Sequence, residues 1–127
     1  MTVEEAIQGG NEILPGQEAL EDEIDPRWQA IIAVGNFIET NPEEVWRFAH
    51  QWGQHADEDL RTAIGTCLLE HLLEHHFDLL FPRLEVAVKS SPEFADAFSR
   101  SWKFGQTSEL SNQVRFNKLM SECKQAR

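Results

Sequence analysis

The stretch Asp25-Pro26-Arg27-Trp28 opens an amphipathic helical segment, and two similar stretches follow it along the chain. They span Asp57–Leu60 and Ser91–Phe94, and they begin 32 and then 34 residues further on. In each copy a large apolar residue ends the opening, a second follows four residues later, and a small residue comes three after that. Self-similarity at this period is typical of helix pairs that stack and bury their faces against neighbouring pairs. The sequence therefore predicts an all-α fold, an α-α superhelix of about five to six helices.

Capping residues place the individual helices. Asp25 and Asp57 carry the short acceptor side chain favoured at a helix N-terminus. A proline follows Asn41 and Ser91 at the first helical position, where no N–H is needed. No stretch alternates with period two for long enough to predict a strand. We expect helices over Pro26–Thr40, Pro42–Gly53, Asp57–His75, Phe77–Lys89, from Pro92 to a stop at Gly105, and over Glu109–Cys123.

The first 24 residues differ from the rest of the chain. Gly9-Gly10, Pro15-Gly16 and the acidic run at 21–23 interrupt any helical period. We predict an acidic, flexible N-terminal segment over 1–24, with one helical turn near its start, and a helical-repeat domain over 25–127. The acidic start lacks the basic region of a secretory signal, and the longest apolar runs are too short to span a membrane. We therefore expect a cytoplasmic protein with no membrane segment.

The net charge of −11 is unevenly distributed. Residues 1–26 carry eight acidic and no basic residues, whereas residues 97–127 carry six basic and two acidic ones. A chain with this overall charge repels phosphate backbones, which argues against general affinity for nucleic acid. The C-terminal bases offer one place for phosphate contact, although a solvated face is the more common role of such a group. Neutralisation by the acidic N-terminal segment explains the bases equally well. The members of this basic group are Arg100, Lys103, Arg115 and Lys118.

Residues 25–35 and 57–65 resemble HEAT-like repeats and are similar to the short repeats of the DNA-alkylation-repair (AlkD-like) family. In that family a repeat starts with an acidic cap, followed by an apolar residue and a basic or polar one. The resemblance covers residues 25–105 and implies a stack of helical hairpins. A full member of that family would have more repeats and a basic groove, so no catalytic residue is carried over to this short, acidic chain. The residues that match the pattern best are Asp57, Leu60 and Arg61.

Two groups of side chains are candidates for chemistry. His71 and His75 are four residues apart, which places both rings on one helix face, as in metal-binding pairs. A metal site also needs ligands from a second element, so we interpret this pair as a polar helix face. The tryptophans fall at inward positions, where core packing is a more common role than holding a damaged base. We predict no catalytic residue, no metal ligand and no cofactor.

One tryptophan is expected at the surface. Trp46 and Phe48 cannot both face inward beside Val45 and Ala49 if the helix buries a single stripe. An exposed aromatic residue is typical of a contact surface. We therefore expect a binding surface formed by this helix and by the acidic start of the next. Its candidate residues are Trp46, Arg47, His50, Asp57, Glu58 and Asp59.

These features favour a non-catalytic HEAT-like module that binds another protein through one face of its stack. The acidic surface suits a basic region of that partner. One alternative is a nucleic-acid-binding or DNA-alkylation-repair-like protein that uses the C-terminal basic group. A second is an acidic inhibitor or immunity-type protein that neutralises a basic toxin or nuclease. A short stack with an uncapped apolar end would also pair with another copy, so a homodimer is a further expectation.

Overall fold

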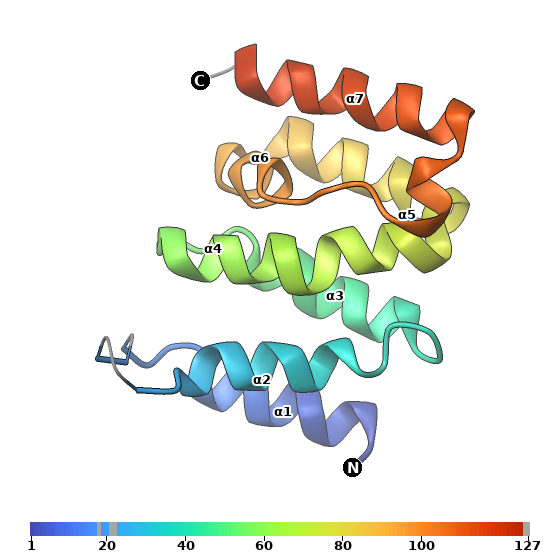
Figure 1. The fold of residues 1–127 in the computed structure, drawn as a ribbon. Coiled ribbons are helices and arrows are strands. Elements are labelled where there is room, and N and C mark those ends of the chain that lie inside the picture. Colours follow the sequence, from blue (N-terminus) through green and yellow to red (C-terminus); the bar gives the residue numbers. More distant parts are fainter. Residues whose placement is uncertain (18, 21–22, 126–127) are drawn as a thin grey trace.

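A computed structural model describes residues 1–17, 19–20 and 23–125, and within these residues the regular elements are all helical. The helices lie in successive layers, with α1 and α2 at one end of the molecule and α7 at the other (Figure 1). This confirms the predicted all-α fold, while the superhelical, HEAT-like arrangement stays a prediction. The elements are α1 (Val3–Ile13), α2 (Pro26–Gly35), α3 (Pro42–Trp52), α4 (Glu58–Ile64), the π-helix η1 (Gly65–Leu69), α5 (Glu70–Ser90), α6 (Pro92–Ser99), the 3₁₀-helix η2 (Gly105–Ser108) and α7 (Leu110–Gln125).

The helix α1 is longer than the single helical turn predicted near the start of the chain. It has 11 residues rather than one turn, and Thr2 and Glu5 form a capping box at its start. Leu14, which follows it, is 1% exposed and belongs to the core. A Cβ on Gly10 would lie 2.8 Å from the ring of Phe48, so this glycine lets α1 approach α3 rather than breaking the helix. The acidic residues Glu18, Glu21 and Asp22 of the predicted segment lie outside the described residues.

The helix α2 is shorter than the sequence predicts. It ends at Gly35 rather than at Thr40. The next N–H groups bond three residues back, from Phe37 to Val34 and from Ile38 to Gly35, which is the tighter pattern of a terminating turn. The carbonyl of Ile38 accepts a hydrogen bond from the ring of His76 at 2.9 Å. This turn is therefore fixed by a residue of a later layer.

One long helical path runs through α4, η1 and α5. The break predicted between His75 and Phe77 is present as a kink, because His76 has φ −140° and ψ 47° inside α5. The freed N–H of Phe77 donates to Oε1 of Gln106 at 2.9 Å. Earlier in the path, a Cβ on Gly65 would lie 2.1 Å from the carbonyl oxygen of Ala97. Glycine is therefore required where this path crosses α6.

Candidate functional site

Trp46 lies in the core, so its predicted exposure is wrong. It is 7% exposed, stacks on His50 with ring centroids 5.4 Å apart, and packs edge-on against Phe94 at 5.8 Å. Helix α3 contacts α1, α4 and α5, so it buries a wider surface than a single stripe. The residues of α3 that are buried together are Val45, Trp46, Phe48 and Ala49.

The other two candidates on α3 are exposed. The side chain of Arg47 is 72% exposed and lies 3.8 Å from Glu44 on the same helix. His50 is exposed beside the buried ring of Trp46. With Trp46 buried, α3 loses the exposed aromatic anchor on which the predicted surface depended.

The acidic start of α4 is occupied by an internal cation. The buried guanidinium of Arg27, 2% exposed, donates from Nη1 to Oδ2 of Asp57 at 2.9 Å and from Nη2 to Oδ2 of Asp59 at 3.1 Å. Its Nη2 also lies 3.5 Å from Asp25. The indole of Trp28 donates to Asp59 at 2.9 Å. The hydrogen bond from Arg27 lowers the pKa of Asp57, so this carboxyl is held charged by its own fold. Asp57 and Asp59 join α4 to α2.

A second set of ion pairs joins α4 to α6. Arg61 donates from Nε to Oδ2 of Asp96 at 2.8 Å. Arg100 donates from Nη2 to Oε1 of Glu58 at 2.6 Å and lies 3.3 Å from Asp96. The charges at the starts of α2 and α4, together with Asp96 within α6 and Arg100 just after it, therefore form a ladder of ion pairs between layers. Glu58, the last acidic candidate, belongs to this ladder.

Two further members of the predicted basic group, Lys103 and Arg115, have internal contacts as well. Lys103 donates from Nζ to Oδ1 of Asn117 at 2.9 Å. The guanidinium of Arg115 lies 3.7 Å from Glu85 and 4.8 Å over the ring of Phe81. Helix α1, which carries described acidic residues of the N-terminal segment, is at the opposite end of the molecule from α7 (Figure 1). The acids that contact this basic group come from α4, α5 and α6 instead.

A groove lies between α2 and the η1–α5 path. We call it the front groove; its volume is 490 Å³. Ile32, predicted to face inward, is 45% exposed in it. The thiol of Cys67 lines it too, and burial raises the pKa of this thiol, which disfavours a nucleophilic thiolate. The residues that line the front groove are Ile32, Gly35, Asn36, Ile38, Glu39, Thr66, Cys67, His71 and His75.

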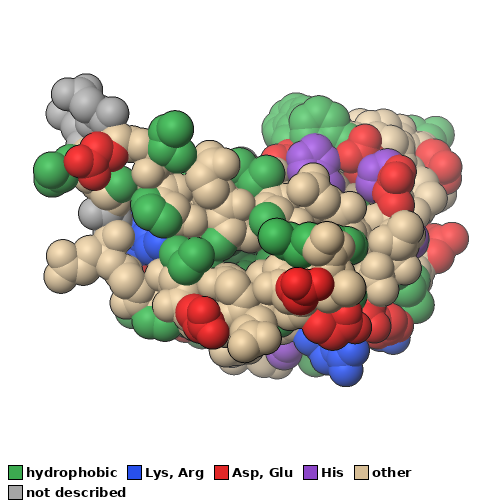
Figure 2. Space-filling view, turned by 90° about the horizontal axis from the view of Figure 1, so that it is seen from below, with side chains coloured by type: hydrophobic (Ala, Val, Ile, Leu, Met, Phe, Trp, Pro, Cys, Tyr) green, Lys and Arg blue, Asp and Glu red, His purple; other side chains and the backbone are tan. Residues whose placement is uncertain are grey.

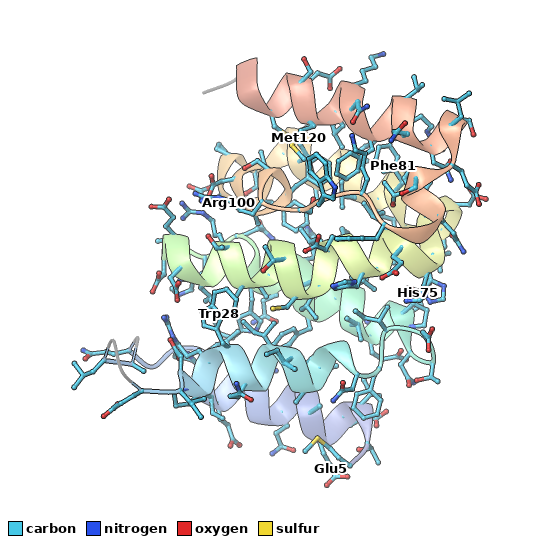
Figure 3. The ribbon with its side chains drawn as sticks, in the orientation of Figure 1. Glu5, Trp28, His75, Phe81, Arg100 and Met120 are labelled. Atoms are coloured by element: carbon cyan, nitrogen blue, oxygen red, sulfur yellow. The ribbon has the colours of Figure 1, made fainter. Side chains whose placement is uncertain are left out.

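The predicted histidine pair borders this groove. Nδ1 of His71 is hydrogen-bonded to Oε1 of Glu74 at 2.8 Å. His75 lies between two carboxylates, with Nδ1 3.4 Å from Glu39 and Nε2 3.6 Å from Glu74. Figure 3 shows His75 beside the turn between α2 and α3, and Figure 2 shows histidines among acidic side chains at one edge of the α1–α2 end. In the part of the chain that the structure describes, no three such side chains converge as metal ligands.

An extended strap, Ser101–Phe104, continues the same face beyond α5. Trp102 is 62% exposed and Phe104 41% exposed, although Trp102 was predicted to face inward. Helix α6 ends at Ser99, earlier than predicted, so Trp102 leaves the helical register. The N–H of Trp102 donates to the buried carboxyl of Glu70 at 3.1 Å, which holds the strap across α5. Burial raises the pKa of this Glu70 carboxyl.

The strap and the front groove meet at His71. Its ring lines the groove and stacks on the ring of Phe104, with centroids 5.7 Å apart and planes 16° apart. At the other end of the strap, the ammonium of Lys103 lies 4.8 Å over the ring of Trp102. The front groove and the strap together are called the front face below. This face was not predicted from the sequence, because residues 101–104 were placed at the end of a helix.

Comparisons of the chain with protein-family models, with curated protein sequences and with solved structures found no match in any of the three. The helices that the structure describes include none with the length and apolarity needed to cross a membrane. The front face combines exposed aromatic side chains, an open groove and acidic side chains at its rim.

Proposed function

We propose that this protein is a non-catalytic binding module that holds another protein on its front face. The observation that carries the proposal is the exposure of Trp102 and Phe104, at 62% and 41%, on a strap whose Phe104 stacks on His71 of the front groove. Aromatic side chains lose much solvent-exposed area with little conformational entropy when a partner covers them, and they dominate many interfaces. The hydrogen bond between Trp102 and Glu70 fixes the strap before a partner arrives.

The ion-pair ladder favours the front face as the binding surface, rather than the acidic start of α4 that was predicted from the sequence. A partner that used Asp57 or Asp59 would compete with the buried guanidinium of Arg27. Removing one member of a buried ion pair leaves an uncompensated charge, which is costly. The same carboxylates are better suited to holding α2 against α4. Binding on the front face leaves that contact intact.

The contacts of the basic group also favour a protein partner over nucleic acid. Arg100 and Arg115 lie against carboxylates, and Lys103 is bonded to Asn117. Nucleic-acid binding needs lysine or arginine side chains that neutralise phosphates and so release the counterions condensed on the nucleic acid. Lys118 is exposed, and alone it offers a small electrostatic gain. The inhibitor or immunity-type alternative remains a protein-binding function and would use the same face.

The test is affinity capture from a lysate of the source organism, run with and without nuclease and read by mass spectrometry. The double variant Trp102→Ala/Phe104→Ala is compared with Leu110→Ala/Val114→Ala, which removes exposed apolar side chains from the outer side of α7. We expect a nuclease-resistant protein that is captured by the wild type and by the α7 variant, and lost with the strap variant. Equal capture by both variants, or capture that disappears with nuclease, would contradict the proposal.

A further inference from the structure

We propose that the front groove receives an arginine side chain from an extended segment of the partner, while an apolar side chain of that segment packs on the strap. This inference rests on the proposed function and names the chemistry of its ligand. Three features of the front face lead to it: the sign of its charge, the stacked rings beside the groove, and the exposed apolar surface next to them.

The charge of the groove is the first feature. Its lining includes Glu39, whose side chain is 74% exposed, and no lysine or arginine. Glu74 lies beside it and contacts both histidines of the rim. Among the residues of the strap, the cation Lys103 is directed to Asn117 of α7. A positively charged side chain in the groove would therefore meet carboxylates without a competing internal arginine or lysine in the lining.

The stacked rings favour arginine among the cationic side chains. His71 and Phe104 present nearly parallel rings, 16° apart, at the junction of groove and strap. A guanidinium is planar, stacks on aromatic rings and bonds a carboxylate through two N–H groups at once, whereas a lysine ammonium is a strongly hydrated point charge. Glu39 and Asn36 line the same groove. The carboxylate of Glu39 and the amide oxygen of Asn36 are acceptors for the N–H groups of a guanidinium.

The exposed apolar surface fixes the second contact of the segment. Trp102 lies beyond Phe104 on the strap, and Ile32 lies in the groove, 45% exposed. Side chains two residues apart on an extended segment lie on the same side of it. One of them can therefore enter the groove while the other, two positions away, covers the strap. The groove itself, at 490 Å³ and open to solvent, fits a side chain rather than a folded domain. The expected ligand is thus an arginine followed or preceded at short distance by a large apolar residue.

A random twelve-residue peptide display library, panned against the full chain, tests this inference directly. The enriched peptides are then measured by fluorescence anisotropy against the wild type, Glu39→Lys, and the matched control Glu12→Lys on the exposed surface of α1. We expect enriched peptides to carry arginine near an aromatic or aliphatic residue. Charge reversal at Glu39 should weaken their binding about fivefold, and lysine in place of the arginine should weaken it by a similar factor.

Two kinds of result overturn the inference. One is the absence of any enriched peptide, or enrichment of peptides without a basic residue. The other is equal binding to Glu39→Lys and Glu12→Lys. The strap variant Trp102→Ala/Phe104→Ala separates these failures from failure of the proposed function. Some peptides or captured proteins could lose binding to the strap variant and still bind Glu39→Lys as they bind the wild type. That result would support the front face as the binding surface and contradict arginine as its ligand.

Discussion

Nη1 of Arg27 donates to Oδ2 of Asp57 at 2.9 Å, although the two residues are 30 positions apart in the chain. The arginine comes from the first turn of α2 and the carboxylate caps α4. Because the guanidinium is only 2% exposed, water does not replace this contact when it is lost. The pair therefore joins α2, which lines one side of the front groove, to the start of the α4–η1–α5 path, which lines the other side.

Replacing Arg27 by methionine should destabilise the protein strongly. The change keeps an apolar stem but leaves Asp57, Asp59 and Asp25 without their shared cation, at a cost of about 3 kcal/mol in the free energy of unfolding. Urea unfolding followed by tryptophan fluorescence measures this cost. The control is Arg47→Met, where the side chain is 72% exposed, and it should change stability by less than about 0.5 kcal/mol. Equal effects of the two changes would show that the buried ion pairs do not hold the layers.

The same contact should make part of the stability depend on pH. The hydrogen bond from Arg27 holds the pKa of Asp57 below 3.8, so the folded state binds this proton less readily than the unfolded chain. The resulting stability is present above the unfolded pKa and is lost as pH falls through the folded pKa. Asp57→Asn keeps an N-cap side chain but removes the charge. The free energy of unfolding of the wild type should exceed that of this variant by about 1 kcal/mol at neutral pH, because Asp57 is partly exposed. The difference should shrink as pH falls through the lowered pKa of Asp57.

Thermal or urea unfolding of both proteins over this pH range checks the sign. A difference that stays constant, or that grows as pH falls, would contradict the assignment of the effect to an ionised Asp57.

Two glycines should respond to alanine in opposite directions. At Gly65 the new Cβ would lie 2.1 Å from the carbonyl oxygen of Ala97, so the substitution forces α6 away from η1. We expect a loss of about 2–3 kcal/mol. At Gly9, inside α1, nothing lies within 4 Å of the new Cβ, and alanine should stabilise the helix by about 0.5–1 kcal/mol. Circular-dichroism melts compare the two variants, and a stabilising Gly65→Ala would contradict the close crossing of η1 and α6.

The N-terminal helix should contribute to global stability. Leu14 is 1% exposed, so Leu14→Ala should cost about 3 kcal/mol through lost burial and a cavity. Its neighbour Ile13 is 40% exposed, and Ile13→Ala should cost less than about 1 kcal/mol. Cooperative urea unfolding of each variant measures the two costs. If both changes were nearly neutral, α1 would not be part of the folded core.

The helix starts were predictable because their signals are local. Asp25 and Asp57 were identified as caps, and Ser91 as the residue before a helix-starting proline. Each of the three side chains accepts an N–H of the following turn, at 2.9, 2.9 and 3.1 Å. The exposed face was not predictable in the same way. Trp102 would face inward only if α6 continued toward Gly105. The strap is instead held by Glu70, which lies 32 residues earlier in the chain. Trp46 is buried because α3 packs against α1, α4 and α5. The spacing of apolar residues along a single helix does not reveal contacts on several sides.

The most direct test of the front face is photo-cross-linking in a lysate of the source organism. A benzophenone side chain replaces Phe104 in one protein and Val114, 61% exposed on α7, in the other. We predict a discrete adduct with one protein at position 104 and none at position 114, and unlabelled wild-type protein should compete it away. Adducts that are equal at both positions, or that contain nucleic acid, would contradict the claim that this face binds a protein.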